Sequence, residues 1–263
     1  MRKFTRPSLI LFLFFLLANP GLLITGCQAL AKPPVETTTP TSTHVPPRVI
    51  ILRRSATPTL LPPTATPQST SPSTPTLALA EEHYIRNISG HRQYFPLVCE
   101  AATAKDWANY FGKDFNEFEF QYKLPVSDNP DLGFVGNVNS PWGQVPPYGY
   151  GVYAGPVAAL LNAYGIPAKA YKGYTLDQIK AKIAEDKPVI VWVIGNVVGG
   201  VPAEYTDKQG NKTIVAAYEH VVIVTGYNKD HVRYMNNGRF FETPNAVFLN
   251  SWGVLGNMVL VDK

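Results

Sequence analysis

Three segments beyond residue 99 show the three- and four-residue apolar spacing of amphipathic helices: 100–111, 152–164 and 175–185. Gly112 follows the first segment and Gly165 the second, and a glycine at that place ends a helix. The third segment opens with Thr175, which is correctly spaced from Gln178 for a capping box. The pattern therefore predicts three helices with defined ends.

Four other segments predict β-strands, namely 188–194, 220–227, 231–235 and 258–261. The first two are β-branched runs bounded by turn residues, which is typical of central strands buried on both faces. A stretch rich in Gly and polar residues, 199–211, predicts an exposed β excursion. Because helices precede strands, we expect an α+β domain over 79–263, with N-terminal helices packed on a C-terminal antiparallel sheet.

The first 26 residues have the organisation of a secretory signal peptide. Basic residues at the start precede an apolar run over 9–17, which is shorter than the roughly 20 residues of a membrane span. Residues 24–27 (ITGC) resemble a bacterial lipobox, which implies cleavage before Cys27 and lipidation of its thiol. An ordinary cleaved signal with an incidental Cys27, or an uncleaved anchor, are the alternatives.

Residues 27–78 form the predicted tether. They consist largely of Thr, Ser and Pro, and such a composition buries too little apolar surface to offset the entropy of ordering the chain. Proline favours an extended conformation, so the tether would hold the following domain away from a membrane surface. Together with lipidated Cys27, it predicts a protein anchored on the extracytoplasmic face of a bacterial membrane.

The net charge of +4 arises entirely in the N-terminal part of the chain. The first 80 residues contain seven Lys and Arg and one acidic residue, whereas the remainder contains 16 basic and 18 acidic residues. The folded part therefore lacks the basic surface of a nucleic-acid-binding protein, and we exclude that class. Two cysteines allow one disulfide at most, which excludes a disulfide-stapled scaffold.

Cys99 is the most informative single residue. Once Cys27 is lipidated, Cys99 has no possible disulfide partner, and it stands at the expected first turn of a helix. The helix dipole and free N–H groups there favour a thiolate, and a nearby histidine cation would lower the thiol pKa further. The alternative is that Cys99 is a small buried apolar residue, as free cysteines often are.

Three other residues fit a cysteine-nucleophile site. Gln93 precedes Cys99 by six residues, where its amide could donate to an oxyanion beside the Cys99 N–H. His220 opens an apolar strand and would lie at the end of the sheet, facing a cleft. Asn236 follows after one turn and one strand, as a hairpin requires to bring it beside the imidazole. Each residue alone is a weak indication, but the set favours catalysis.

At these residues the chain resembles the papain-like cysteine peptidases, and in particular the C39-type family in a secreted form. The matching segments are QYFPLVCEAA (93–102), LPVSDNPDLGFVG (124–136), YGYGVY (148–153), PVIVW (188–192) and EHVVIVTGY (219–227). They are spread over nearly all of 91–261. The resemblance implies a papain-like fold, with Cys99 as nucleophile, His220 as general base and then acid, and Gln93 as oxyanion donor.

The third member of the implied triad departs from the family pattern. The family usually has an Asp-Pro pair after the strand that follows the histidine, whereas this chain has Asn236 and Asn237. An asparagine orients a histidine by hydrogen bonding but adds no full charge beside the imidazolium. Asn250, in an Asn-Ser-Trp-Gly sequence that resembles a papain signature, is a rival orienting residue, and we favour Asn236.

Two features fit either a functional or a structural role. The segment 124–136 is rich in turn residues and is expected to expose Phe134, so it fits either a substrate cleft or a structural loop. Trp142, Tyr150 and Trp192 would line the cleft or belong to the core. The remaining histidines lack the spacing of metal ligands, and we expect no metal and no cofactor: His44, His83, His91 and His231.

These observations predict a monomeric, membrane-anchored cysteine peptidase acting on a peptide or protein substrate through a thioester intermediate. An amidase or acyltransferase acting on cell-wall peptides would use the same chemistry. A catalytically silent papain-fold binding module is a third possibility, of a different class.

Overall fold

The computed structural model describes residues 79–263. The predicted signal peptide (1–26), the lipidation site Cys27 and the tether (27–78) lie outside the described residues, and nothing in the structure tests them. Among residues 79–263, no helix combines the length and the apolar character needed to cross a membrane.

A seven-stranded antiparallel sheet forms the centre of the described part, with strands in the order β2-β9-β3-β6-β7-β8 and β1 paired to β6. The strands are β1 (His83–Tyr84), β2 (Ala168–Tyr171), β3 (Val189–Ile194), β6 (Glu219–Tyr227), β7 (His231–Asn236), β8 (Arg239–Pro244) and β9 (Val259–Asp262). A separate two-stranded ribbon consists of β4 (Ala203–Thr206) and β5 (Lys212–Val215).

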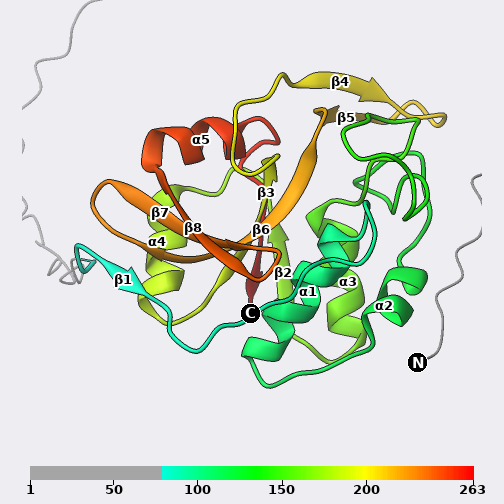
Figure 1. Ribbon diagram of the computed structural model, residues 1–263. Helices are drawn as coiled ribbons and strands as arrows, with labels where there is room; N and C mark the ends of the chain where they lie inside the picture. Colours follow the sequence, from blue (N-terminus) through cyan, green and yellow to red (C-terminus); the bar gives the residue numbers. More distant parts are fainter. Residues whose placement is uncertain (1–78) are drawn as a thin grey trace, which may run out of the picture. The chain divides into compact units, whose positions relative to one another are not determined.

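Helices cover both faces of this sheet, since every residue of β3 and β6 is buried. The helices are α1 (Cys99–Tyr110), α2 (Glu117–Lys123), α3 (Ala154–Ala163), α4 (Leu176–Ala184) and α5 (Asn245–Gly253). In Figure 1, α1, α2 and α3 lie to one side of the sheet, and α4 and α5 lie to the other. The arrangement is the predicted α+β class.

The three predicted helices are confirmed as α1, α3 and α4. Gly112 and Gly165 follow the first two helices with φ of +69° and +72°, the left-handed conformation that ends a helix. The capping box of α4 is complete: Thr175 Oγ1 accepts from the Gln178 N–H at 3.2 Å, and Gln178 Oε1 accepts from the Thr175 N–H at 2.9 Å.

The four predicted strands are confirmed as β3, β6, β7 and β9. The predicted β excursion corresponds to the ribbon β4–β5, whose second strand lies just beyond the expected range. Five elements were not predicted, namely β1, β2, β8, α2 and α5. They are nine residues or fewer in length, and α2 and α5 place only a minority of their side chains in the core. Short elements of this kind depend on tertiary contacts, which a local pattern does not contain.

Of the three aromatic residues considered for the cleft, two belong to the core. Trp192 is fully buried and its Nε1 donates to the Val152 carbonyl at 3.0 Å, and Tyr150 is buried against the Tyr153 hydroxyl at 2.9 Å. Only Trp142 reaches the candidate site. Both buried rings find a polar partner, as buried Trp and Tyr generally require.

The expectation that the loop 124–136 exposes Phe134 is wrong. The Phe134 N–H donates to the Pro125 carbonyl at 2.6 Å, and the Ser127 N–H donates to the Phe134 carbonyl at 3.1 Å, so the loop doubles back on itself. This pairing turns Phe134 inward, with 5% of its surface exposed, and leaves Val126 on the outside. Turn-rich sequence indicated a surface loop but not which of its side chains faces the core.

Candidate active site

Cys99 is the first residue of α1, as the sequence predicts. The helix begins after Val98, which provides no side-chain cap, so the Cys99 N–H points out of the helix end without an acceptor within the helix. The thiol is free and 4% exposed. The position combines a nucleophilic atom with a backbone N–H that has no partner within the helix.

The surroundings of the thiol differ from the predicted ones. Cys99 Sγ donates to Glu100 Oε2 at 3.3 Å, and a carboxylate oxygen of Glu219 lies within 4.8 Å. Burial, followed by the charges of Glu100 and Glu219, raises the pKa of the Cys99 thiol well above its usual range. The predicted lowering of this pKa is therefore wrong for the resting site, because the thiol is buried and lies beside two carboxyl groups.

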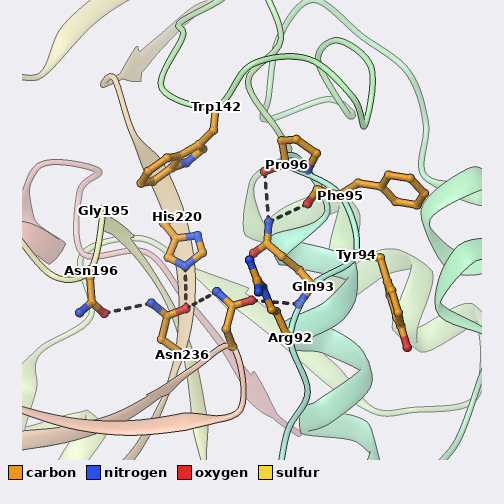
Figure 2. A pocket seen from close by; sticks show the side chains of 11 residues that line it. Arg92, Gln93, Tyr94, Phe95, Pro96, Trp142, Gly195, Asn196, His220 and Asn236 are labelled. Atoms are coloured by element: carbon orange, nitrogen blue, oxygen red, sulfur yellow. Dashed lines mark hydrogen bonds between the residues drawn. The ribbon is translucent and has the colours of Figure 1, made fainter. Parts of the chain in front are cut away.

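His220 pairs with Asn236 across the hairpin between β6 and β7. Its Nε2 lies 2.8 Å from Asn236 Oδ1, as Figure 2 shows. The Asn237 amide donates to the same Oδ1 at 3.0 Å, and Asn236 Nδ2 donates to Asn196 at 2.9 Å. These bonds assign Oδ1 as the acceptor, so Nε2 carries the proton and Nδ1 is the basic atom.

Burial lowers the pKa of His220, and the hydrogen bond to Asn236 partly opposes that effect. The imidazole is therefore neutral near pH 7, which is the state a general base requires. The Trp142 ring lies edge-on to His220 with centroids 6.0 Å apart, and Trp142 Nε1 donates to the Glu219 carbonyl at 2.9 Å. Trp142 thus helps to hold the start of β6 in place.

Asn250, the rival orienting residue, lies elsewhere. It is an exposed residue of α5, its amide adjoins Gly199, and no hydrogen bond joins it to His220. Its neighbour Ser251 is buried and exchanges hydrogen bonds with the backbone of Ile194. The Asn-Ser-Trp-Gly sequence therefore has a structural role in α5, and Asn236 is the residue that pairs with the imidazole.

Gln93 lies on the loop leading into α1 and borders the same cleft as His220 (Figure 2). Its Nε2 donates to the carbonyls of Phe95 and Pro96 at 2.8 and 3.1 Å, and its backbone N–H donates to Asn237 Oδ1 at 2.9 Å. Both amide protons are thus used within the loop. To stabilise an oxyanion, the Gln93 amide must release one of these two carbonyls and donate to the substrate oxygen instead.

The structure brings the four predicted site residues together. Cys99, Gln93, His220 and Asn236 line one small internal cavity of about 10 Å³, about enough for one water molecule. The last three also line an open cleft of about 450 Å³. No hydrogen bond joins Sγ to the imidazole, since the thiol donates to Glu100 instead.

A second, apolar pocket of about 330 Å³ adjoins the cleft, and Phe95 lines both. It lies between α2 and the loop 124–136, and its apolar lining includes Val98, Phe118, Leu124, Val126, Phe134 and Val138. The loop 124–136 therefore packs Phe134 inward and still contributes to a concave surface beside the site.

His91 holds the loop that leads to Gln93 in place through two side-chain contacts. Its Nδ1 lies 2.7 Å from Asp106 of α1, and its Nε2 lies 2.7 Å from Glu117 of α2. Burial lowers the pKa of His91, but the hydrogen bonds and charges of Asp106 and Glu117 more than offset that effect, so the pKa is raised. His91 thus links two helices to the segment preceding the nucleophile.

Several residues of the site are missing from the sequence-based candidates: Glu100, Glu219, Asn196 and His91. Glu100 follows Cys99 and Glu219 precedes His220 in the sequence. This adjacency to two predicted catalytic residues is the signal that could have identified them. Asn196 follows the end of β3, and only the tertiary fold brings it to β7.

Comparison with protein families shows to which family the chain belongs. Residues 84–258, more than half of the chain, match the Peptidase_C39 like family. The chain belongs to this family. The match spans α1, β6 and β7, and so includes Cys99, His220 and Asn236. The resemblance to the C39-type family is confirmed, and so is the papain-like α+β fold, whereas the secreted form of that family stays a prediction.

One solved structure supports the fold, and two others overlap more distantly. A C39-like peptidase from Bacillus anthracis overlaps with a TM-score of 0.61 at 19% identity, over 70% of this chain and 98% of that one. Xylellain, a cysteine protease from Xylella fastidiosa, overlaps at 0.40 with 14% identity, over 71% and 87%. The peptidase domain of Streptococcus ComA, a bifunctional ABC transporter in a quorum-sensing pathway, overlaps at 0.40 with 12% identity, over 66% and 98%. The last two overlaps are too distant to support an argument, and no curated protein sequence matched.

Proposed function

We propose that this member of the family is an active cysteine peptidase that hydrolyses peptide bonds through Cys99, His220 and Asn236. The observation that supports the proposal is the Asn236–His220 hydrogen bond in an open cleft, with the free Cys99 thiol lining a small cavity that His220 and Asn236 also line. A neutral, oriented imidazole beside a nucleophile is the arrangement that acyl transfer requires.

In the proposed reaction, the Cys99 thiol turns from Glu100 toward His220 and gives its proton to Nδ1. Sγ then attacks the substrate carbonyl carbon, and the Cys99 N–H and the Gln93 amide stabilise the oxyanion. His220 passes its proton to the leaving amine, which produces a thioester. Water, deprotonated by His220, attacks the thioester and releases the acid, and Sγ recovers the proton.

We also propose that the chain is a lipoprotein, anchored through Cys27 on the extracytoplasmic face of a bacterial membrane. The lipobox-like residues 24–27 and the Thr/Ser/Pro-rich segment 27–78 support this proposal. Metabolic labelling with palmitate should mark the wild-type chain and not the Cys27→Ser variant. Equal labelling of both chains would overturn the anchoring proposal.

Peptide-library cleavage by the full chain tests the catalytic proposal. The wild type should cleave a subset of peptides, while Cys99→Ala and His220→Ala should reduce the rate below detection. Cys27→Ser is the matched control, because it removes the other thiol and leaves the site unchanged. Cleavage that survives Cys99→Ala would place the chemistry elsewhere in the molecule.

The same assay with purified cell-wall muropeptides separates the alternatives. Turnover of muropeptides without cleavage of unfolded proteins would identify an amidase or acyltransferase. Binding of either ligand without turnover would identify a silent papain-fold module, which the neutral, buried Cys99 thiol would suit.

A further inference from the structure

Two buried carboxyl groups adjoin the nucleophile, and the proposed mechanism uses neither. Glu100 is 1% exposed and Glu219 is 2% exposed. One oxygen of each, together with Cys99 Sγ, forms a group of three atoms that all lie within 4.8 Å of one another. The three residues come from the first turn of α1 and the first residue of β6. They form a compact set of one sulfur and two oxygen donors.

The carboxyl group of Glu219 has no partner for either oxygen. Both Oε atoms are fully buried and form no hydrogen bond. Glu100 uses Oε1 to accept from the Val152 N–H at 2.6 Å, which leaves Oε2 for the thiol. Within residues 79–263, no Lys, Arg or His forms an ion pair with either carboxyl group.

Burying a carboxyl group without a hydrogen bond or a counter-charge is costly. A cation between the three donors removes that cost, because it supplies the missing partner of Glu219 and neutralises both carboxylates. The site does not suit an organic cation, since its three donor atoms lie within 4.8 Å of one another and leave no room for one between them. A single ion is the ligand whose size fits.

The donor set selects the ion. A thiolate with two carboxylates suits Zn²⁺, a borderline-soft ion that binds Cys and Asp or Glu in tetrahedral sites with distances of about 2.0–2.3 Å. Mg²⁺ and Ca²⁺ instead require mostly oxygen ligands and higher coordination numbers. Inward movements of the three side chains within their 4.8 Å grouping would complete the coordination.

We propose that Cys99, Glu100 and Glu219 form a Zn²⁺ site that switches the nucleophile off. Zn²⁺ takes up the sulfur lone pair that would attack the substrate, and the thiol proton, with any carboxyl proton, passes to solvent. A water molecule would take the fourth position. The proposal that the ion binds is argued from the geometry alone. The proposal that it inhibits the enzyme rests on the proposed peptidase function.

A Cd²⁺ titration of the full chain tests the site without a substrate. In the Cys27→Ser background, Cys99 is the only thiol, so sulfur-to-cadmium charge-transfer absorption reports this site alone. We expect saturation at one ion per chain, displacement by Zn²⁺, and no band in Cys99→Ser. Glu219→Gln should weaken binding at least tenfold, and His220→Asn should leave it unchanged.

Glu100→Gln serves as a second variant in case Glu219→Gln fails to fold, since the Gln carbonyl still accepts from the Val152 N–H. It should also weaken Cd²⁺ binding at least tenfold. Absence of the band in the folded Cys27→Ser chain would overturn the proposal. The proposal would also be overturned if His220→Asn abolished Cd²⁺ binding while both Glu variants left it intact, because the ligands would then be Cys99 and His220.

Inhibition is measured separately on the proposed peptidase activity. Zn²⁺ should reduce cleavage by the wild type, and the Glu219→Gln chain should need at least tenfold more Zn²⁺ for the same effect. If the chain binds Cd²⁺ as expected but cleaves no substrate, the ion site is supported and the proposed peptidase function is overturned. If the chain cleaves substrate and shows no Cd²⁺ band, only the ion-site proposal is overturned.

Discussion

Asn236 Oδ1 accepts a hydrogen bond from Nε2 of His220 at 2.8 Å, and this bond determines which imidazole nitrogen is basic. The Asn237 amide donates to the same oxygen, which leaves no ambiguity about its identity as the acceptor. The chain thus orients its histidine with a neutral amide where its family usually has an Asp-Pro pair.

Replacing Asn236 by Ala should lower kcat/KM roughly 10²-fold, because the imidazole loses the partner that sets its orientation and tautomer. Steady-state kinetics on a cleaved library peptide measures the effect. Asn250→Ala is the matched control and should leave kcat/KM unchanged, since Asn250 is exposed and makes no contact with His220. The reverse pattern would reassign the triad to Asn250.

Gln93→Ala should lower kcat by roughly 10²–10³ through loss of one oxyanion donor. Since the Gln93 amide also holds the carbonyls of Phe95 and Pro96, thermal unfolding of the variant should accompany the kinetics. A kcat that equals the wild-type value would remove Gln93 from the catalytic machinery and leave it a role in the loop only.

Gly151→Ala should lower the free energy of unfolding by about 1–3 kcal/mol. Gly151 has φ of +128°, and a Cβ there would collide with Glu100 Oε1. Gly165→Ala is the matched control, because Gly165 has φ of +72° and open space around it, so only backbone strain of about 1 kcal/mol applies. Urea unfolding of both variants checks the order, and an equal loss in the two would argue against crowding at Glu100.

The His91 contacts predict how stability changes with pH. The pKa of His91 is raised above its ordinary value of 6.5, and burial raises the pKa values of Asp106 and Glu117 despite their bonds to His91. All three groups therefore bind protons more tightly in the folded state. The contribution of His91 to stability is present below its ordinary pKa of 6.5 and is lost as pH rises through its raised folded-state value. The contributions of Asp106 and Glu117 are present below their own ordinary carboxyl pKa values and are lost as pH rises through their raised folded-state values.

His91→Gln isolates this contribution. Urea midpoints of the wild type and the variant should differ most below pH 6.5 and converge as the pH rises above the raised folded-state pKa of His91. Lys105 is the other basic group whose charge acts on both Asp106 and Glu117. A wild-type advantage that grows with pH would contradict the assignment of His91 as the charged partner.

The sequence predicts the elements whose signals are local. The Thr175–Gln178 capping box and the β-branched runs of β3 and β6 are examples, because propensity and capping act within a few residues. The placement of Cys99 at the start of a helix follows from the same kind of signal. Short elements such as α2 and β8 depend on tertiary contacts instead and were not predicted.

The candidate site was predicted in part. Spacing suggested that Asn236 would lie beside His220, and the family resemblance supplied the roles of these residues and of Gln93. The environment of the thiol was not predictable, because it depends on Glu219 reaching Cys99 from a strand distant in sequence. Burial of the thiol, followed by the charges of Glu100 and Glu219, reversed the direction of the Cys99 pKa shift.

Successive side chains of a strand point to opposite faces, so Glu219 and His220 at the start of β6 occupy different environments. The antiparallel pairing fixes this choice, with Glu219 opposite Ile194 and His220 opposite Val193. A deletion of one residue between β5 and β6 that slipped this pairing would exchange the acid and the imidazole and abolish the chemistry without changing any residue of the site. Homologous chains that retain activity should therefore tolerate insertions in the ribbon tip rather than in this connection.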